Sequence, residues 1–532
     1  MRNNFTFTHT VSRQVLENYL SRAVTAQDIF NSDTLADDIR MLTSVGAKFI
    51  GRAAGVWRPP DDDDAHFARA AEVVGKIHAA DPQIILQAAI FEAVYEGVER
   101  ILVPGWVFEE FGLPVEERTF RYDAMLFPDG RHVVQWRGGG SVPDVRQVET
   151  RMWFFYRARR YIDAGFEAFH FGQVHLYGSM DRGYLATAGL LRRVREYAAR
   201  RARRHMVLCD AHTNGISARG RLLFDLHATI LFLREIEGRP HRCRIVRHGC
   251  SKGGISPSGW ACDHLPYLAE FDNYGGAMRT GPHSIQVKKE NGELYGPGES
   301  TPGVLWPWGY DEIAWFAHQG PQYRGEFLRC AWEWFAANDP NGHLQMPCRR
   351  RVGGAPVTME SADGGAAEVG VYKANRPSPA CPTGFGDEDA IREIWEGSAE
   401  PSLASCKKPS APAGDEDHWR DPETGFDYPR KVVLAGTLQS ALGGAEWETD
   451  SEVGRMEYIG SGRYRLAPSF PPSDPHEPPR SYEFRICIGG SWTENYGQGG
   501  IADGGNFQFT PPIDGGSVEF VFDYDTKELR VG

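Results

Sequence analysis

Two apolar runs in this chain end in acidic residues, and their spacing suggests hydrolytic chemistry. "HMVLCDAH" (205–212) closes with Asp210 and His212, and "PYLAEFDNYGG" (266–276) carries Glu270 and Asp272. Side chains two apart on a β-strand point to the same face, so each run presents a polar pair. Glycoside hydrolysis needs two carboxyl groups, an acid for the leaving oxygen and a nucleophile or base. The pattern predicts Asp210 and Glu270 as that pair.

Further polar residues follow the same kind of run. Glu92 closes "IILQAAIFE", and both Glu92 and Asp272 are additional catalytic candidates. Each acid also has a structural interpretation: Asp210 could cap a loop, Glu92 could begin a helix and Asp272 could form a turn. Hydrogen bonding to sugar hydroxyls, or stacking on sugar rings, is expected of a second group of residues, namely His170, Gln173, His175, His212, Trp260, Trp308 and Tyr310.

The histidines leave a second hypothesis open. Asp210, His170, His175 and His212 are all ligand types that a divalent metal accepts, which would suit a metal-dependent hydrolase or a sugar isomerase. The chain lacks compact HxH or HExxH spacing in this region, so neither a metal nor another cofactor is expected. A glycan-binding protein without catalytic activity is the third hypothesis.

Alternating strands and helices must position these residues. Strands are expected at 47–54, 84–92, 166–176, 205–212, 243–249, 266–276, 304–309 and 343–347, with amphipathic stretches such as 144–164 and 190–203 between them. Eight such units predict an α/β fold of the (β/α)8 TIM-barrel type over residues 1–350, since no GxGxxG motif supports a dinucleotide fold. Active sites of such barrels lie at the carboxyl ends of the strands. Glu92, Asp210 and Glu270 would then end the second, fourth and sixth strands.

The composition changes after the barrel. Residues 351–430 are rich in Gly, Pro, Ala and Ser, which indicates a linker or extended belt, with one short helix expected in "GDEDAIREIWEG". From residue 431 to 532 only short alternating strands remain, as in "SYEFRICIGG" and "SVEFVFDYDTKELRV". That pattern predicts an all-β, immunoglobulin-like sandwich.

Charge and hydropathy limit the partners. The net charge of −13 argues against a nucleic-acid binder, and no run approaches the about 20 apolar residues of a membrane span. The N-terminus has no charged start followed by an apolar core, which favours a cytoplasmic location without excluding an extracellular one. A carbohydrate is therefore the expected partner, and the sandwich could also serve as a homodimer contact.

The last hundred residues resemble a known family. "GTLQSALGGAEWETD" and "YEFRICIGGSWTENYGQGGIADGGNFQF" are similar to the starch-binding-like immunoglobulin-type modules of bacterial amylopullulanases. The resemblance implies an accessory carbohydrate-binding or spacing sandwich, with Trp447, Trp492 and Tyr496 available to stack on sugars or to fill the core. The first 350 residues look like a glycoside-hydrolase-type barrel but lack the Arg-x-Asp strand of the α-amylase superfamily. A pullulanase activity is therefore not carried over, and we expect a glycoside hydrolase acting on a poly- or oligosaccharide.

Overall fold

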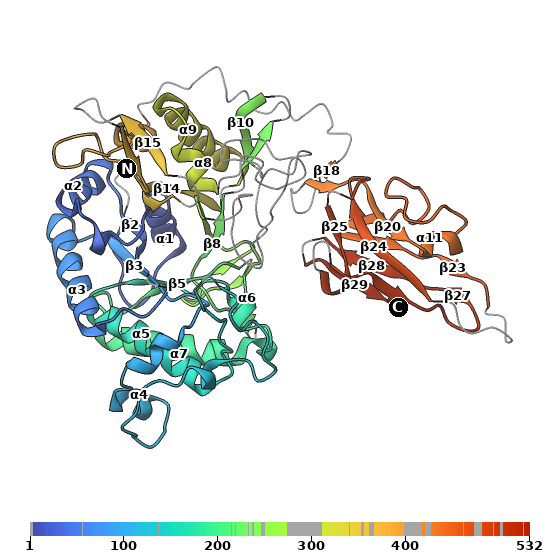
Figure 1. Ribbon diagram of the computed structural model, residues 1–532, viewed down its shortest axis with the longest axis horizontal. Helices are drawn as coiled ribbons and strands as arrows, with labels where there is room; N and C mark the ends of the chain where they lie inside the picture. The colour runs from blue at the N-terminus through green and yellow to red at the C-terminus, as the bar shows by residue number, and fades with distance from the viewer. Residues whose placement is uncertain are drawn as a thin grey trace. The chain divides into compact units, whose positions relative to one another are not determined.

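The computed structural model divides the chain into two compact units, residues 1–405 and 406–532 (Figure 1). Each unit is described by itself. The residues described here are 4–55, 57–136, 138–213, 215–218, 220–231, 233–236, 239–245, 251–273, 311–339, 341–352, 356–360, 366–397, 418–420, 427–460, 462–472, 481–492, 494–500, 504–524 and 526–532.

Eight parallel strands form a barrel in the first unit. They are β1 (Ala23–Ala26), β2 (Phe49–Ala54), β3 (Ile85–Ala89), β4 (Ala168–His170), β5 (Leu208–Asp210), β8 (His227–Ile230), β13 (Tyr267–Glu270) and β14 (Gly342–Arg351). Neighbours in the ring pair in the order β5-β4-β3-β2-β1-β14-β13-β8. A parallel bridge between His212 and Ala228 joins the two ends of this sheet. The predicted (β/α)8-type barrel is thus confirmed.

One of the expected strands is corrected by this topology, and two strands of the ring were not expected. β1 and β8, each only four residues long, belong to the ring and were not predicted. The expected strand at 243–249 instead overlaps β10 (Arg239–Ile245), which pairs antiparallel with β9 (Leu233–Ile236) outside the ring. The expected strand at 304–309 lies outside the described residues. Asp210 and Glu270 consequently end the fifth and seventh strands, and Glu92 follows the third.

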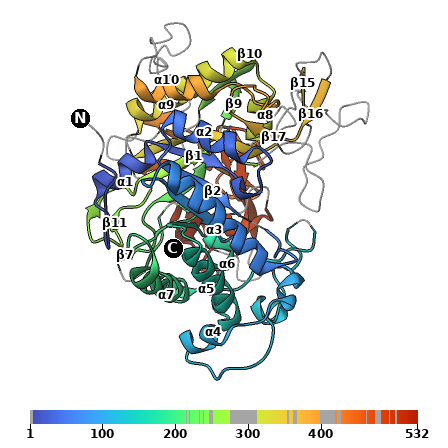
Figure 2. The same ribbon diagram turned by 90° about the vertical axis from the view of Figure 1, so that its left-hand side faces the viewer.

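Helices cover the outside of the barrel (Figure 2). The first four strands are followed by α2 (Leu35–Val45), α3 (Asp63–Ala80), α5 (Val148–Asp163) and α7 (Leu185–Arg201), with α4 (Gly105–Glu110) and α6 (Val174–Tyr177) in the connections. The described residues between β5 and β13 form no helix; besides the ring strand β8 and the pair β9 and β10, they form the short strands β6 (Ser217–Ala218), β7 (Arg221–Leu222), β11 (Gly254–Ile255) and β12 (Ala261–Cys262). α8 (Glu312–Ala317) and α9 (Pro321–Asn338) precede β14.

At the seam where β5 meets β8 and the barrel closes, a side-chain carboxylate replaces part of the main-chain hydrogen bonding between the strands. The buried carboxylate of Asp225 accepts the backbone N–H of Cys209 at 2.9 Å and a guanidinium N–H of Arg195 from α7 at 3.0 Å. The N–H of Ala228 donates to the carbonyl of Ala211 at 3.0 Å. Few main-chain bonds therefore close the ring at this point.

The amino ends of the strands are covered by the N-terminal segment. α1 (Arg13–Leu20) and residues such as Phe5 and Val11 pack against Phe49, Ile85 and Leu208, which lie at or near the start of three strands. Burying this apolar surface seals one end of the barrel and leaves the carboxyl end for polar side chains.

The segment from 351 to 430, expected as a linker with a helix, contains elements that pack on the barrel unit. β17 (Val371–Lys373) pairs antiparallel with the end of β14, beside the hairpin of β15 (Val357–Glu360) and β16 (Ala366–Val369). The helix α10 (Glu388–Glu396) is tied to α2 by the ion pair of Glu388 with Arg40, whose Nη1 lies 2.6 Å from Oε1.

The second unit is an antiparallel β structure. One sheet contains β20 (Val432–Gly436), β24 (Tyr482–Ile488), β25 (Glu494–Tyr496) and β26 (Phe507–Phe509); the other contains β21 (Glu457–Gly460), β22 (Arg463–Leu466), β28 (Phe520–Asp523) and β29 (Glu528–Val531). The rings of Phe484 and Phe520, one from each sheet, lie 5.8 Å apart, so the sheets face each other. The predicted sandwich is confirmed.

Shorter elements complete this unit. They are the pairs β18 (His418–Arg420) with β19 (Asp427–Pro429) and β23 (Ser469–Phe470) with β27 (Gly516–Ser517), and the helical turn α11 (Leu438–Ala441). Across all described residues of both units, no helix combines the length and apolar character that crossing a bilayer requires.

Candidate active site

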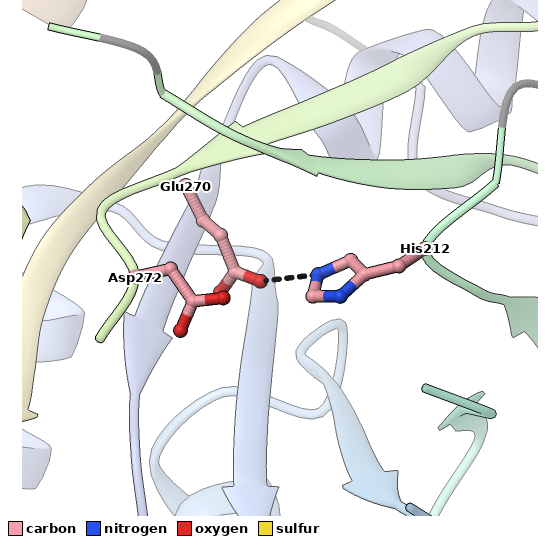
Figure 3. A group of neighbouring side chains, drawn as sticks. All are labelled: His212, Glu270 and Asp272. Carbon is pink, nitrogen blue, oxygen red and sulfur yellow. Dashed lines mark hydrogen bonds and ion pairs between the residues drawn. The ribbon is translucent and has the colours of Figure 1, made fainter. Parts of the chain in front are cut away.

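Three polar side chains meet at the carboxyl end of the barrel (Figure 3). Glu270 ends β13, Asp272 follows two residues later, and His212 lies two residues beyond β5. The Nε2 atom of His212 is 3.2 Å from Oε1 of Glu270. The two acids are side by side because residues two apart on an extended chain share a face.

Two arginines that sequence reasoning missed hold these acids. Arg52 of β2 donates through Nε to both Glu270 oxygens, at 3.1 and 2.9 Å, and its Nη2 also bonds Glu270. Arg350 of β14 donates through Nη1 to Glu270 Oε2 at 3.2 Å and through Nη2 to Asp272. Planar guanidinium groups match carboxylate geometry, which explains why arginine serves at both positions. The local charges balance as two cations against two anions.

Arg52 reaches this position through an irregularity in its strand. The register between β2 and β3 shifts between Ile50 and Ala54, and Arg52 has φ of 55°. A β-bulge redirects a side chain, and a non-glycine residue at positive φ is costly enough to need support from its surroundings. That support includes the bond from the Arg52 N–H to Oε1 of Gln87, at 3.0 Å.

Asp210 ends β5, two residues before His212. Its Oδ1 accepts a bond from Nε2 of Gln87 at 2.9 Å and lies 3.2 Å from Nδ1 of His170. One amide, that of Gln87, therefore connects the backbone of Arg52 to the carboxyl of Asp210. The His170 ring stands edge-on to the His212 ring, with centroids 4.7 Å apart.

Burial acts on the two strand-ending acids with opposite results. Burial raises the pKa of Asp210 to about 7, and the opposing effects of the nearby His212 and Arg52 only partly offset it. Burial would also raise the pKa of Glu270, yet Arg52 and Arg350 outweigh it and hold that pKa well below its usual range. The same arginines lower the pKa of Asp272. Near neutral pH the centre thus contains a protonatable acid beside ionised carboxylates.

Glu92 forms a separate contact at the edge of this centre. Its Oε2 accepts the backbone N–H of Gln173 at 2.9 Å, and its Oε1 accepts the Gln173 side-chain amide at 3.1 Å. Gly172 permits this approach: it has φ of 58°, and a Cβ there would lie 1.9 Å from Glu92 Oε2. The loop after β4 is therefore fastened to the loop after β3 through one carboxylate.

The structure brings together most of the residues expected from the sequence. Asp210, His170, His212, Glu270 and Asp272 form one connected group, and Glu92 with Gln173 forms the neighbouring pair. His175 is exposed on the short helix α6. Trp308 and Tyr310 lie outside the described residues.

Trp260 does not join this group, contrary to expectation. Its indole N–H donates to the carbonyl of Val11 at 3.0 Å, and its ring packs against the cluster at the amino end of the barrel. An aromatic residue in a polar, glycine-rich stretch resembles a sugar platform in sequence, but here the ring covers apolar surface of the N-terminal segment.

Accessibility separates the centre into two layers. The side chains of Asp210, Glu270 and Arg350 are each 2% exposed, whereas those of His212 and Asp272 are 20% and 18% exposed. A ligand entering the mouth would therefore meet His212 and Asp272 first and cover the deeper acids.

One metal-type cluster also occurs among the described residues. His212, Glu270 and Asp272 each offer a ligand atom, all within 4.8 Å of one another. This trio differs from the set considered from sequence, since only His212 belongs to both. The two guanidiniums already neutralise its carboxylates, so a cation would compete with Arg52 and Arg350.

Fold and site define a (β/α)8-barrel protein with a buried acid–arginine centre at the carboxyl ends of its strands, followed by a β-sandwich. Residues 431–529, which include most of that sandwich, match the family described as the Pullulanase X25 domain. The predicted likeness of the C-terminal module to amylopullulanase modules is thereby confirmed.

The sequence aligns with curated relatives over only a limited part of the chain. An amylopullulanase of Thermoanaerobacterium thermosulfurigenes is 25% identical over 177 residues, which is 30% of this chain and 9% of that protein. One from Thermoanaerobacterium saccharolyticum is 24% identical over 177 residues, 30% of this chain and 13% of that protein. The chain thus spans only a small fraction of these relatives.

Solved structures give weaker likenesses. The pullulanase from Bacillus acidopullulyticus is 26% identical, covering 21% of this chain and 13% of that one, with a TM-score of 0.17. The Nostoc punctiforme debranching enzyme is 9% identical, covering 88% of this chain and 92% of that one, with a TM-score of 0.33.

Proposed function

We propose that this protein is a glycoside hydrolase that cleaves a poly- or oligosaccharide at the carboxyl end of its barrel. The observation that carries the proposal is the opposite electrostatic state of neighbouring acids. Asp210, with its pKa raised to about 7, keeps a proton to donate, whereas Asp272 and Glu270 are held ionised by arginines. Paired carboxyl groups with separated pKa values are what acid-assisted glycosidic cleavage requires.

The roles follow from bonding and accessibility. Asp210 would protonate the leaving oxygen, and Gln87 and His170 would orient its carboxyl. Asp272 is the more accessible ionised acid and would serve as nucleophile or as base for water. Glu270, bonded by Arg52 and Arg350, would fix both guanidiniums, which leaves Asp272 as the accessible negative charge beside the sugar. Negative charge at this place favours the oxocarbenium-like transition state.

The attached module supports a carbohydrate as the substrate class. Its family is named for pullulanases, and the matched curated relatives are called amylopullulanases. An aromatic pair is available on the module, since the rings of the half-buried Trp447 and of Trp492, which is 42% exposed, lie 6.1 Å apart. Aromatic faces with a polar edge suit sugar rings. An α-glucan is accordingly the first polysaccharide to test.

The test is a panel of α- and β-linked polysaccharides, assayed for new reducing ends with analysis of product length and anomer. The wild type should release sugar from at least one member, and Asp210→Asn and Asp272→Asn should each lose nearly all of that activity. The matched control is Asp64→Asn, because the side chain of Asp64 is 89% exposed on α3. Full activity in both site variants would overturn the residue assignment, and no release from any member would overturn the proposed class.

A second candidate rests on the cluster of His212, Glu270 and Asp272. If Arg52 and Arg350 moved aside, these three side chains could hold a divalent cation for a metal-dependent hydrolase or sugar isomerase. Such an enzyme would lose activity on chelation and regain it with a divalent metal. The acid–arginine pairing favours the first proposal, because two positive charges already lie against the carboxylates.

A further inference from the structure

An aromatic surface continues outward from the acid centre. The ring of Phe91, just after β3, lies 6.4 Å from the His170 ring and 5.8 Å from the Arg52 guanidinium carbon. The indole of Trp57, in the loop after β2, stacks on Phe91 with centroids 4.7 Å apart and an interplanar angle of 22°. Trp136 meets the Trp57 ring edge-on at 5.5 Å.

Trp57 is the most accessible tryptophan among the described residues of this unit. It is 38% exposed, although stacking on Phe91 buries one of its faces. A small pocket lies beside it, lined by Trp57, Pro59, Phe91 and Tyr95 and, deeper, by Trp153 and Arg157 of α5. Exposed aromatic rings next to a polar centre usually have a binding role, because leaving such area in water is unfavourable.

The loop that carries Trp136 is fixed against this surface. Arg58 donates to the carbonyl of Gly138 at 3.1 Å, and its guanidinium lies over the Tyr95 ring. Gly138 has φ of 70°, and a Cβ there would overlap the Arg58 guanidinium. The buried Nε1 of Trp136 has no hydrogen-bond partner among the described residues. An unpartnered buried donor is costly unless a ligand or water satisfies it.

From these observations we infer that Trp57, with Trp136 and Arg58, forms a sugar-binding subsite of the proposed glycoside hydrolase, beyond the sugar at the reacting bond. The apolar face of a pyranose ring packs on the Trp57 indole, while its hydroxyls face the guanidinium of Arg58 and the indole N–H of Trp136. The ligand class is a neutral oligosaccharide, because the centre beside the subsite has balanced charges.

This inference rests on the proposed function, and substrate length tests it. Oligosaccharides of increasing length, prepared from the polysaccharide that the wild type cleaves, are assayed with the full chain carrying Trp57→Ala or Trp57→Phe. Trp57→Ala should raise KM for long substrates about five- to tenfold with kcat nearly unchanged, and leave the shortest cleavable substrate unaffected. Trp57→Phe should recover part of the affinity. Equal effects at every length, or none, would overturn the subsite.

A control variant and a second subsite variant complete this test. Trp260→Phe alters a tryptophan at the other end of the barrel and should leave the length dependence as in the wild type. Gly138→Ala should reproduce the Trp57→Ala pattern, because the added methyl group displaces the loop of Trp136 from Arg58.

A binding measurement distinguishes failure of the subsite from failure of the proposed function. Calorimetric titration of soluble malto-oligosaccharides and cello-oligosaccharides compares the wild type with Trp57→Ala without requiring turnover. If the wild type cleaves nothing but binds a sugar that Trp57→Ala does not bind, the glycosidase proposal fails and the subsite stands. If the wild type and Trp57→Ala bind both the malto-oligosaccharides and the cello-oligosaccharides with equal affinity, the subsite proposal fails, whatever the activity.

Discussion

Asp210 and Glu270 end strands on either side of β8, both almost fully buried, and their electrostatic environments differ. Glu270 is bonded by two guanidiniums, whereas the Oδ1 atom of Asp210 contacts a neutral amide and an imidazole. The first acid is therefore held as an anion and the second is free to carry a proton near neutral pH. Several measurable consequences arise from this difference.

Replacing Asp210 should stabilise the protein while inactivating it. Its pKa is higher folded than unfolded, so the folded state binds an extra proton between about pH 4 and pH 7, and stability from this group falls as pH rises through that window. Asp210→Asn removes this loss. The free energy of unfolding should increase by about 1–3 kcal/mol at pH 8 and hardly at pH 4. Denaturant unfolding at both pH values measures it.

The matched variant Asp64→Asn should change the free energy of unfolding by no more than about 0.5 kcal/mol at either pH, because that side chain is exposed. A loss of stability in Asp210→Asn at pH 8 would instead identify Asp210 as a structural anion.

The pH profile of the reaction should have its basic limb near neutrality. An acid catalyst must be protonated, so kcat/KM should decline above about pH 7 as Asp210 ionises. The acidic limb should lie below the usual range of carboxylic acids, because arginines lower the pKa of Asp272. Initial rates across buffers of constant ionic strength give both limbs. A rate still rising beyond pH 9 would contradict the assigned role of Asp210.

Removing the positive charge of Arg52 should destabilise the protein, because it leaves the buried Glu270 carboxylate incompletely paired. Arg52→Met leaves Glu270 with fewer partners, and we expect destabilisation of about 3–5 kcal/mol at pH 7. Because the lowered pKa of Glu270 contributes its full stability above the unfolded pKa and loses it as pH falls through the folded pKa, the penalty should shrink as pH falls below the ordinary range of glutamate. The control Arg192→Met removes an exposed partner of Glu196 and should cost under about 1 kcal/mol. Comparable losses in both variants, or a penalty independent of pH, would count against this view.

Gly172→Ala should destabilise the loop after β4 by more than the strain of placing alanine at a positive φ. Gly172 and Gly112 both have positive φ, but a Cβ at Gly112 meets nothing within 4 Å, whereas one at Gly172 overlaps the Glu92 carboxylate. Gly112→Ala should cost about 1–2 kcal/mol, and Gly172→Ala should cost more and also lower kcat/KM. Thermal unfolding and initial rates test the pair. Identical behaviour of the two variants would show that the Glu92–Gln173 contact is unimportant.

Chelation distinguishes the two proposed chemistries. With Arg52 and Arg350 neutralising the carboxylates, activity should survive overnight dialysis against EDTA within about twofold. Elemental analysis of the dialysed protein provides the control for complete removal. Loss of activity that a divalent metal restores would replace the acid–arginine mechanism with the cluster of His212, Glu270 and Asp272 as a metal centre.

Sequence reasoning predicted the architecture and most of the acid centre, for reasons that can be stated. Asp210 and Glu270 end apolar runs, and strand ends meet at one edge of a barrel. β1 and β8 were missed because four residues are too few for a periodic signal. Arg52 was missed because no local pattern predicts a bulge. A signal existed, since a charged residue within "FIGRAA" needs a buried partner.

The partnership of Arg52 and Arg350 with Glu270 could not be obtained from spacing. These residues are far apart in the chain, and their contact depends on how β2, β13 and β14 are ordered around the ring. Gln87 could not be found for another reason: a single amide inside an apolar strand has many uses, and its bonds to Arg52 and Asp210 arise only from the folded arrangement of β2, β3 and β5.

The barrel should open locally more easily at the seam between β5 and β8 than between its other strands, because few main-chain hydrogen bonds close the ring there. Asp225 and the bridge of His212 with Ala228 close the ring, so His212 both joins the strands and contacts Glu270. Hydrogen exchange at the Ala228 amide would report fluctuations of this junction. Opening of this seam would therefore move His212 relative to Glu270, and ligands that cover His212 should slow that exchange.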